Sequence, residues 1–274
     1  MSVFITSLNS GSNGNCYYVG THNEAVLVDV GLSCREIEIR MKKLGLSMEK
    51  VKAVFVSHEH TDHIKGVATL VNRYYLPLYI TPPTASKLKL IRHLSRSFES
   101  DQPIQVGSFT VTPFKKFHDA VDPHSFLISA HGIHVGVFTD IGSVCDKLTE
   151  YFSKCHAAFL ESNYDEEMLE NGGYPIHLKN RIRGGHGHLS NREALTLFKQ
   201  HKAEHLSLLL LSHLSKENNN PQLALELFRA HAGNTHIAVA SRYGASEIFE
   251  VSAPNNPNSS LPKIKPGIQQ SLFA

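Results

Sequence analysis

A histidine- and aspartate-rich motif, SHEHTDH at residues 57–63, is the feature of the sequence most able to do chemistry. It holds four potential metal ligands, His58, His60, Asp62 and His63. Imidazole nitrogens and carboxylate oxygens suit zinc, manganese or iron. The motif follows the apolar run AVFVS, so we expect it to leave a strand end with His58 and His60 facing the same way. Asp62 and His63 can face a second point nearby, so one motif predicts two neighbouring metal positions.

Further ligands are expected at later strand ends, because one motif cannot complete two coordination shells. His118 follows FTVTPFKKF, Asp140 follows HVGVFT, and His213 follows LSLLLLS. Taken alone, each is equally well explained by the polar residues that often end strands. For the motif itself the alternative is a polar surface turn, but four potential ligands within six residues after an apolar strand strongly favour a metal site. Their recurrence at the same position after a hydrophobic run favours a common site at a sheet edge.

The elements that would position these residues can be read from hydrophobic patterning. Short β-branched or apolar runs bounded by turn residues predict strands at VFITSL, CYYVG, AVLVDVG, AVFVSH, LYIT, FTVTPF, SFLIS, HVGVFTD, AAFLES, LSLLLLSH and IAVAS. Helical periodicity predicts helices over residues 33–44, 63–74, 83–95, 165–171, 190–202 and 220–231. The run LSLLLL indicates a strand buried on both faces. The expected fold is α/β, an αββα four-layer sandwich of two mixed β-sheets flanked by helices.

Length and composition favour one folded domain. The 274 residues, 41% of them hydrophobic, allow one substantial core, although two small domains would also fit this length. From Ala253 the chain becomes rich in Pro, Asn and Ser, so we expect a domain over residues 1–252 and a disordered tail over 253–274. Four scattered cysteines indicate neither a disulfide framework nor a cysteine zinc site. Without a leader or long apolar run, a cytoplasmic protein with no membrane contact is expected.

Charge gives no overall signature for binding nucleic acid. The 27 basic and 25 acidic residues leave a formal net charge of +2, so any such binding must depend on local clusters. Lys179, Arg181 and Arg183 precede His188 in a glycine-rich loop that could approach a phosphate closely, and we expect them to bind nucleic acid. A second basic stretch, at 87–96, is better explained as a solvated helix face.

Taken together, these motifs resemble the metallo-β-lactamase superfamily over nearly the whole chain up to about residue 252. The resemblance implies two divalent metal ions, one on His58, His60, His118 and bridging Asp140, the other on Asp62, His63, His213 and the same Asp140. It implies that Asp29, after AVLV, supports the loop by hydrogen bonds. His and Asp ligands leave zinc and manganese both open. An Asp at position 140, where many thiol-dependent β-lactamases carry Cys, favours the phosphodiesterase and thioester-hydrolase branches.

Two further strings, ESN at 161–163 and GHLS at 187–190, resemble extra motifs of nucleic-acid-processing members such as ribonuclease J and the cleavage-factor nucleases. The resemblance implies that His188 reaches the scissile phosphate or protonates the leaving oxygen, while Glu161 orients it. With Asp62 these are the expected catalytic side chains. The intervals between the later ligands are too short for the inserted cap domain of those nucleases or the tRNA-clamping arm of ribonuclease Z.

The strings SLNSGSNGNCYYV, GHLSN and LSHLSKENNNP resemble the YycJ/WalJ group of this superfamily. That resemblance implies a DNA exonuclease of duplex ends or nicks, active in DNA repair. It also implies a loop beside the site in which Ser12 and Asn15 contact nucleic acid, although composition explains this loop equally well as a turn. In the tail, Gln269, Leu272 and Phe273 resemble the QxxLF-type peptide that binds the bacterial sliding clamp, so clamp binding is expected.

The expected reaction is two-metal phosphodiester hydrolysis without a covalent protein nucleophile. One alternative is a hydrolase of small esters, thioesters or cyclic phosphodiesters that uses the same metals. Another is a non-catalytic, clamp-associated DNA-binding module with a structural metal. Structural zinc sites are normally closed by four ligands, whereas seven ligands around a bridging carboxylate leave positions open for water, which favours an enzyme.

Overall fold

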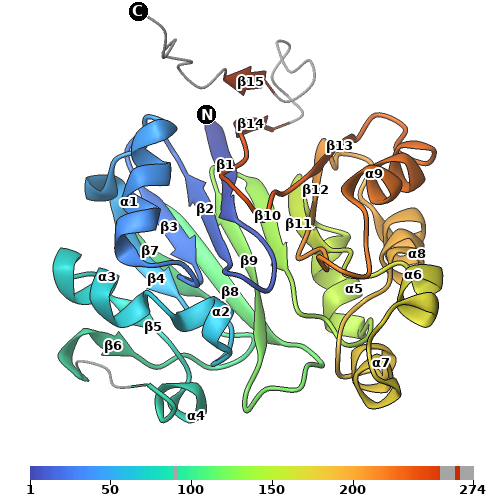
Figure 1. Cartoon of the computed structure of the whole chain (residues 1–274). Coiled ribbons are helices and arrows are strands. Elements are labelled where there is room, and N and C mark those ends of the chain that lie inside the picture. Colours follow the sequence, from blue (N-terminus) through green and yellow to red (C-terminus); the bar gives the residue numbers. More distant parts are fainter. Residues whose placement is uncertain (89–91, 254–262, 266–274) are drawn as a thin grey trace, which may run out of the picture.

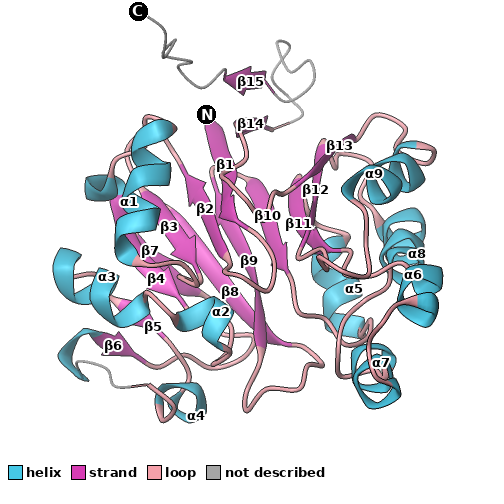
Figure 2. Ribbon diagram, in the orientation of Figure 1, coloured by secondary structure: helices cyan, strands magenta, loops and turns pink. Residues whose placement is uncertain are grey.

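The computed structural model describes residues 1–88, 92–253 and 263–265. Its strands form two mixed sheets that pack face to face between outer layers of helices (Figures 1 and 2). This arrangement confirms the predicted αββα sandwich. Among the described residues, no helix is long and apolar enough to span a membrane.

Eight strands form the first sheet, in the order β15-β14-β1-β2-β3-β4-β5-β6. They are β1 (Ser2–Asn9), β2 (Cys16–Gly20), β3 (Ala25–Val28), β4 (Val51–Phe55), β5 (Leu78–Tyr79), β6 (Ser95–Arg96), β14 (Ile248–Ser252) and β15 (Lys263–Lys265). The second sheet has the order β13-β12-β11-β10-β9-β8-β7. Its strands are β7 (Ile104–Val106), β8 (Phe109–Lys115), β9 (His124–Ala130), β10 (Ile133–Phe138), β11 (Ala157–Glu161), β12 (Leu208–Ser212) and β13 (His236–Val239).

Helices cover both outer faces of the sandwich. They are α1 (Cys34–Lys43), α2 (Thr61–Ile64), α3 (Val67–Tyr74), α4 (Pro82–Ala85), α5 (Asp146–Phe152), α6 (Glu166–Asn171), α7 (Ile176–Arg183), α8 (Asn191–His201) and α9 (Pro221–Arg229), with short 3-10 turns at Met48–Lys50 and Arg92–Leu94. Helices α1 and α3 share a buried cluster with the first sheet. Helices α5, α8 and α9 share another with the second sheet.

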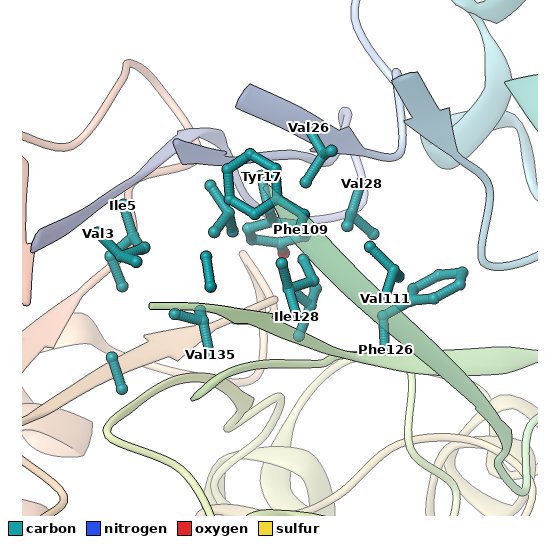
Figure 3. Packing of buried hydrophobic residues seen from close by; sticks show 14 of the residues in the cluster. Val3, Ile5, Tyr17, Val26, Val28, Phe109, Val111, Phe126, Ile128 and Val135 are labelled. Carbon is teal, nitrogen blue, oxygen red and sulfur yellow. The ribbon is translucent and has the colours of Figure 1, made fainter. Parts of the chain in front are cut away.

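Strand alternation explains why the strands are apolar throughout. In β12, Leu208 and Leu210 point into the core between the sheets, whereas Leu209 and Leu211 pack under the helices. Figure 3 shows the core between the sheets, where Val26 and Val28 of β3 face Phe109, Val111 and other residues of the second sheet. Both faces of each central strand are therefore buried, as the run LSLLLL predicts.

The helix predictions were partly wrong. The helix expected over 63–74 is two, α2 and α3, because the Gly66 N–H donates to the Val30 carbonyl (2.8 Å) instead of continuing one helix. Over 83–95 the described part holds α4, the 3-10 turn and the beginning of β6. Helices α5 and α7 and strands β6, β7, β14 and β15 were not predicted. Within the expected tail, Lys263–Lys265 pair antiparallel with β14.

Parallel pairing brings the ends of distant strands to one edge of the sandwich. Strands β10, β11 and β12 are parallel neighbours, with Phe138 beside Leu160 and Glu161 beside Ser212. In the first sheet β3 and β4 are parallel, with Val28 beside Phe55. The residues that follow these strands therefore meet at the carboxyl edges of both sheets.

Candidate metal centre

All seven predicted ligands lie together at this edge. His58 and His60 follow β4, Asp62 and His63 lie in α2, His118 follows β8, Asp140 follows β10, and His213 follows β12. Their ligand atoms fall into overlapping groups whose members lie within 4.8 Å of one another.

Three histidines form the first group. His58 Nε2 lies 3.1 Å from His60 Nδ1, and His118 Nε2 lies 3.3 Å from the same atom. The other nitrogen of His118, Nδ1, donates to the Gly187 carbonyl oxygen at 2.9 Å. This hydrogen bond fixes the tautomer and leaves Nε2 as a lone-pair donor, the state that a metal requires.

Asp62, His63 and His213 form the second group. His63 Nε2 and His213 Nε2 each lie 3.5 Å from Asp62 Oδ2. Two imidazole nitrogens and a carboxylate oxygen are an ordinary donor set for a divalent transition metal.

Asp140 lies between the two groups. One of its oxygens is 3.2 Å from His63 Nε2; the other is 3.4 Å from His213 Nε2 and 3.8 Å from His118 Nε2. The backbone presents this carboxylate in the left-handed conformation, with φ of 56°. A carboxylate that faces both groups has the position that a bridging ligand requires.

Two observations indicate that the site fits cations. Within the described part of the chain, buried Asp140 Oδ2 and His213 Nε2 have no hydrogen-bond partner, a costly arrangement unless something else binds them. Four carboxylates also gather here, those of Asp62, Asp140, Asp29 and Glu161, with the last three almost fully buried. Buried carboxylates cost several kcal/mol each unless they are neutralised, so the donor set suits divalent cations.

Asp29 forms hydrogen bonds with the histidine motif. Its Oδ2 accepts from His63 Nδ1 at 2.7 Å and from Ser57 Oγ at 2.8 Å, and its Oδ1 accepts from the Ser57 N–H at 2.8 Å. Ser57 Oγ also lies 2.8 Å from His58 Nδ1. One carboxylate thus orients a member of each group, with Ser57 as the intermediary for His58.

Glu161 and His188 lie beside the two groups. Glu161 Oε1 accepts from His188 Nδ1 at 2.8 Å and from His213 Nδ1 at 3.0 Å. Glu161 Oε2 accepts from the Ile141 N–H at 2.7 Å. The His188 ring centroid is 5.3 Å from that of His118 and 5.2 Å from that of His213. With 19% of its side chain exposed, His188 can meet a substrate, whereas the Glu161 side chain is fully buried.

The pKa shifts follow the same charge distribution. Burial lowers the pKa of His118 to about 3 and holds the pKa of His58 well below its usual value, so both stay neutral. Burial alone would lower the pKa of His213, but Asp140, Asp62 and Glu161 outweigh it and raise the pKa to about 10. The potential that holds a proton on His213 would also attract a metal cation.

The carboxylates are held ionised by their histidine neighbours. Burial would raise the pKa of Asp62 and of Glu161, but nearby histidines outweigh burial and lower each pKa to about 2. Histidines also hold the pKa of Asp140 well below its usual range, against the effect of burial. At neutral pH these three residues therefore offer anionic oxygens.

The three expected phosphate-binding residues lie in a helix, and the expectation of a loop was wrong. Lys179, Arg181 and Arg183 belong to α7, and the glycine-rich segment begins only after it. Arg181 forms an ion pair with Asp119 beside His118, and Arg183 pairs with Glu170 at 2.8 Å. Lys179 Nζ donates to the Glu170 carbonyl. Arg181 and Arg183 are exposed and Lys179 is half-buried, and all three are already engaged with neighbours at the rim of the site.

The structure buries Asn15 and leaves Ser12 exposed, although both were expected to contact nucleic acid. Asn15 is fully buried, and its Nδ2 lies 3.2 Å from Asp62 Oδ2 and 3.1 Å from His63 Nε2. It therefore contacts predicted metal ligands and cannot reach a polymer. Ser12 is exposed and accepts a hydrogen bond from Arg242.

Sequence reasoning missed Lys116, a buried cation beside the site. Its Nζ donates to the Thr139 carbonyl at 2.7 Å, next to Asp140. Burial lowers its pKa, and the surrounding carboxylates oppose that effect. The only signal was a charged residue two positions before His118. Gln269, Leu272 and Phe273, which were predicted to bind the sliding clamp, lie outside the described residues.

Comparisons with known proteins agree with this geometry. Residues 24–213 match the family model described as a beta-lactamase superfamily domain. The chain is 32% identical to an exodeoxyribonuclease YycJ of Bacillus anthracis over 92% of its own length and 95% of that protein. It is also 32% identical to an exodeoxyribonuclease WalJ of Streptococcus pneumoniae, over 79% and 83% respectively.

A solved structure gives the same fold. The metallo-beta-lactamase fold protein YhfI of Bacillus subtilis superposes with a TM-score of 0.71 at 20% identity, covering 91% of this chain and all of that one. The fold, the family model and the buried His/Asp groups all lead to the same assignment. The chain belongs to the metallo-β-lactamase superfamily.

Proposed function

We propose that this protein is a dinuclear metal-dependent phosphodiester hydrolase of nucleic acid, and specifically a DNA exonuclease that acts in repair. The observation that carries the proposal is the pair His188–Glu161, joined at 2.8 Å and placed beside two ligand groups that face one carboxylate, Asp140. A partly exposed histidine oriented by a buried carboxylate is suited to binding phosphate and moving a proton. The relatives named exodeoxyribonucleases support DNA as the substrate.

The proposed metal ligands are those predicted from the sequence. One zinc or manganese ion would be held by His58, His60, His118 and Asp140, and the other by Asp62, His63, His213 and Asp140. When bound, two such cations supply an activated water and neutralise charge on the phosphoryl group.

The chain itself supplies orientation and proton transfer. Glu161 accepts the Nδ1–H of His188, so the opposite ring nitrogen, Nε2, is the atom that carries or releases the mobile proton. The protonated ring would stabilise charge on the departing oxygen and then donate its proton to it, and the anionic Glu161 would stabilise the imidazolium. Asp62 would hold the attacking water by accepting a hydrogen bond from it.

Digestion of end-labelled linear, nicked and single-stranded DNA by metal-loaded protein tests the proposal. A His60→Ala, Asp62→Ala variant is the control for metal dependence. We expect cleavage that starts at ends or nicks and disappears in the variant. Bound metal with no cleavage of any nucleic acid would refute the nuclease proposal and favour a hydrolase of small esters or cyclic phosphodiesters.

Helix α7 is proposed to bind phosphates at the rim of the site. Its basic residues Lys179, Arg181 and Arg183 share one short helix, and Arg181 is fixed by Asp119 next to His118. We expect a Lys179→Ala, Arg183→Ala variant to lose DNA affinity while keeping its metal content. Unchanged affinity would contradict this role.

The terminal residues Gln269, Leu272 and Phe273 are proposed to bind the sliding clamp, because two apolar anchors beside a glutamine suit a hydrophobic pocket. Pull-down of the clamp by the full chain, compared with a chain lacking residues 269–274, tests this. Equal recovery of the clamp by the two chains would refute clamp binding. If the protein were instead a non-catalytic DNA-binding module, it would bind the clamp and DNA without cleaving either DNA strand.

A further inference from the structure

The loop after β13 lies against the Ser10–Asn15 loop. The Ser10 N–H donates to the Ser241 carbonyl at 3.1 Å, and Asn13 Nδ2 donates to the Arg242 carbonyl at 2.7 Å. Farther along, the Ser246 N–H donates to the Ser7 carbonyl at 2.8 Å. The loop is thus anchored at both ends, and Tyr243 is the exposed residue between the anchors.

The Ser10–Asn15 loop connects residues 242–245 to the metal centre. Ser10 Oγ accepts from the His213 N–H at 2.7 Å, and Asn15 Nδ2 lies 3.2 Å from Asp62 Oδ2. Arg242 itself lies 3.4 Å from the carbonyl oxygen of Leu214, the residue after His213. The loop therefore borders the centre beside its second ligand group.

Arg242 and Tyr243 place a guanidinium group and an exposed aromatic ring at this border. Tyr243 is 76% exposed, so no packing explains its aromatic ring. The Arg242 guanidinium lies 6.0 Å from the Tyr243 ring centroid and donates to Ser12 Oγ and the Leu214 carbonyl. Within residues 1–88 and 92–253 it has no carboxylate partner, in contrast to Arg181 and Arg183 of α7. Its charge is therefore available to an anion.

We infer that Arg242 and Tyr243 form a binding element for one nucleotide of a single-stranded nucleic-acid segment next to the metal centre. The inference rests on the proposed function and adds how the strand is held. A base would stack on the exposed Tyr243 ring, and its phosphate would bind the Arg242 guanidinium. Base–aromatic stacking requires an unpaired base, so the ligand is a frayed or single-stranded end.

The loop is preorganised for this task. The Tyr243 N–H donates to Ser241 Oγ at 3.0 Å, and Asn13 and Ser12 hold the backbone and guanidinium of Arg242. Binding would then cost little loop entropy, which favours affinity. The element also lies on a flank different from that of α7, whose Arg181 pairs with Asp119 beside His118.

The test is binding of a fluorescent, hydrolysis-resistant phosphorothioate oligonucleotide to the metal-loaded protein, followed by anisotropy over a range of salt concentrations. The variants are Tyr243→Ala and Arg242→Gln. Matched controls are Tyr75→Ala, a tyrosine that is 77% exposed, and Arg229→Gln, an exposed arginine of α9. Both controls precede parallel strands, β5 and β13, so they lie at the edge opposite the ligands.

We expect Tyr243→Ala to weaken binding of the single strand roughly tenfold with an unchanged salt dependence, because stacking is not ionic. Arg242→Gln should weaken binding and reduce the slope of log affinity against log salt by about 0.7, the loss of one phosphate contact. Neither control variant should change affinity or slope.

Equal affinities for the wild type and both variants, in a protein that still cleaves DNA, would overturn this element and leave the proposed function intact. A salt slope unchanged by Arg242→Gln would exclude the phosphate contact. A wild type that neither binds nor cleaves any nucleic acid would overturn the proposed function, and this inference with it.

Discussion

At the scale of single residues, Glu161 connects several parts of the site through hydrogen bonds. Its two oxygens accept hydrogen bonds from His188, His213 and the Ile141 N–H, which adjoins Asp140. One buried carboxylate therefore orients the proposed proton donor and a proposed ligand together. Residues that orient metal ligands affect metal affinity as well as geometry. Replacement of Glu161 should therefore change both catalysis and metal binding, and the two effects can be measured separately.

Replacement of Glu161 by Gln should slow DNA cleavage about 100-fold or more, because the amide cannot stabilise a protonated His188. Metal affinity should fall by about 10- to 100-fold through the weakened support of His213. Cleavage rates at saturating metal, together with metal titration, separate the two effects. A variant with unimpaired cleavage at saturating metal would contradict the role of His188–Glu161.

The later proposed ligands could be located from the sequence because each lies within three residues of the end of a strand. His118, Asp140 and His213 come after apolar runs whose end is visible in the sequence, and parallel pairing brings such ends together. Residues such as Asn15 and Arg242 act through tertiary contacts with loops far away in the chain, as in the hydrogen bond from Arg242 to Ser12. Single-sequence patterns contain no signal for contacts of this kind.

At the scale of elements, the loops after β1, β3 and β4 meet around one glycine. The Gly31 N–H donates to the Asn15 carbonyl, and the Asn15 N–H donates to the Asp62 carbonyl. A Cβ atom on Gly31 would lie 1.6 Å from the Asp62 carbonyl oxygen. The motif DVG was predicted only as a strand end, because the sequence does not show which backbone approaches a glycine. Likewise, the glycines after Arg183 favoured a loop where the chain forms α7.

Gly31→Ala should destabilise the protein by about 3 kcal/mol and weaken metal binding, since the backbone at Asp62 must move to accept the methyl group. Denaturant unfolding and metal titration measure the two effects. Gly173→Ala, with no atom within 4 Å of its added Cβ, is the control. A stable Gly31→Ala protein with unaltered metal affinity would show that the loops can separate without harm.

A histidine cluster lies near the start of β10 and β11, away from the metal centre. The His156 ring centroid is 5.5 Å from that of His134 and 4.3 Å from that of His205, and the His134 N–H donates to His156 Nδ1 at 3.1 Å. Burial, reinforced by these two neighbours, lowers the pKa of His156 to about 4. The folded protein therefore takes up a proton on His156 at a lower pH than the unfolded chain does.

Neutral His156 should make the protein acid-sensitive. Its folded pKa is about 4 against an ordinary value of about 6.5, so its contribution is complete above about pH 6.5 and is lost as pH falls toward 4. Between pH 7 and 5 we expect the wild type to lose about 1 kcal/mol more than His156→Asn, whose amide oxygen can accept from His134. Denaturant unfolding at both pH values measures the free energy of unfolding of the two proteins. An equal loss of stability by the wild type and the variant between pH 7 and 5 would contradict this.

At the scale of the whole molecule, the two sheets are joined by their shared core and by the metal centre. The first sheet supplies His58, His60 and the residues of α2, and the second supplies His118, Asp140 and His213. The pairing of the sheets was predictable, because alternation along doubly buried strands requires a layer on each side. The exact strand order was not, since β14, from the far end of the chain, pairs with β1, and β15 pairs with β14.

Removal of metal should therefore loosen the whole sandwich. A ligand present at about 1,000 times its Kd stabilises the folded state by about 4 kcal/mol, which for a chain of this size corresponds to a rise in Tm of roughly 10 °C. Thermal unfolding before and after chelation, and again after metal is restored, measures this. An unchanged Tm in protein shown to have lost its metal would mean that the sheets assemble independently of the centre.

The hydrogen bond from the His213 N–H to Ser10 Oγ spans 203 positions of the chain. During synthesis on a ribosome, a growing chain can present His58, His60 and His118 long before β12 leaves the exit tunnel. The second proposed ligand group, which contains Asp62, His63 and His213, is complete only after His213 has been synthesised. The first proposed ligand group could then meet a metal ion earlier in synthesis than the second.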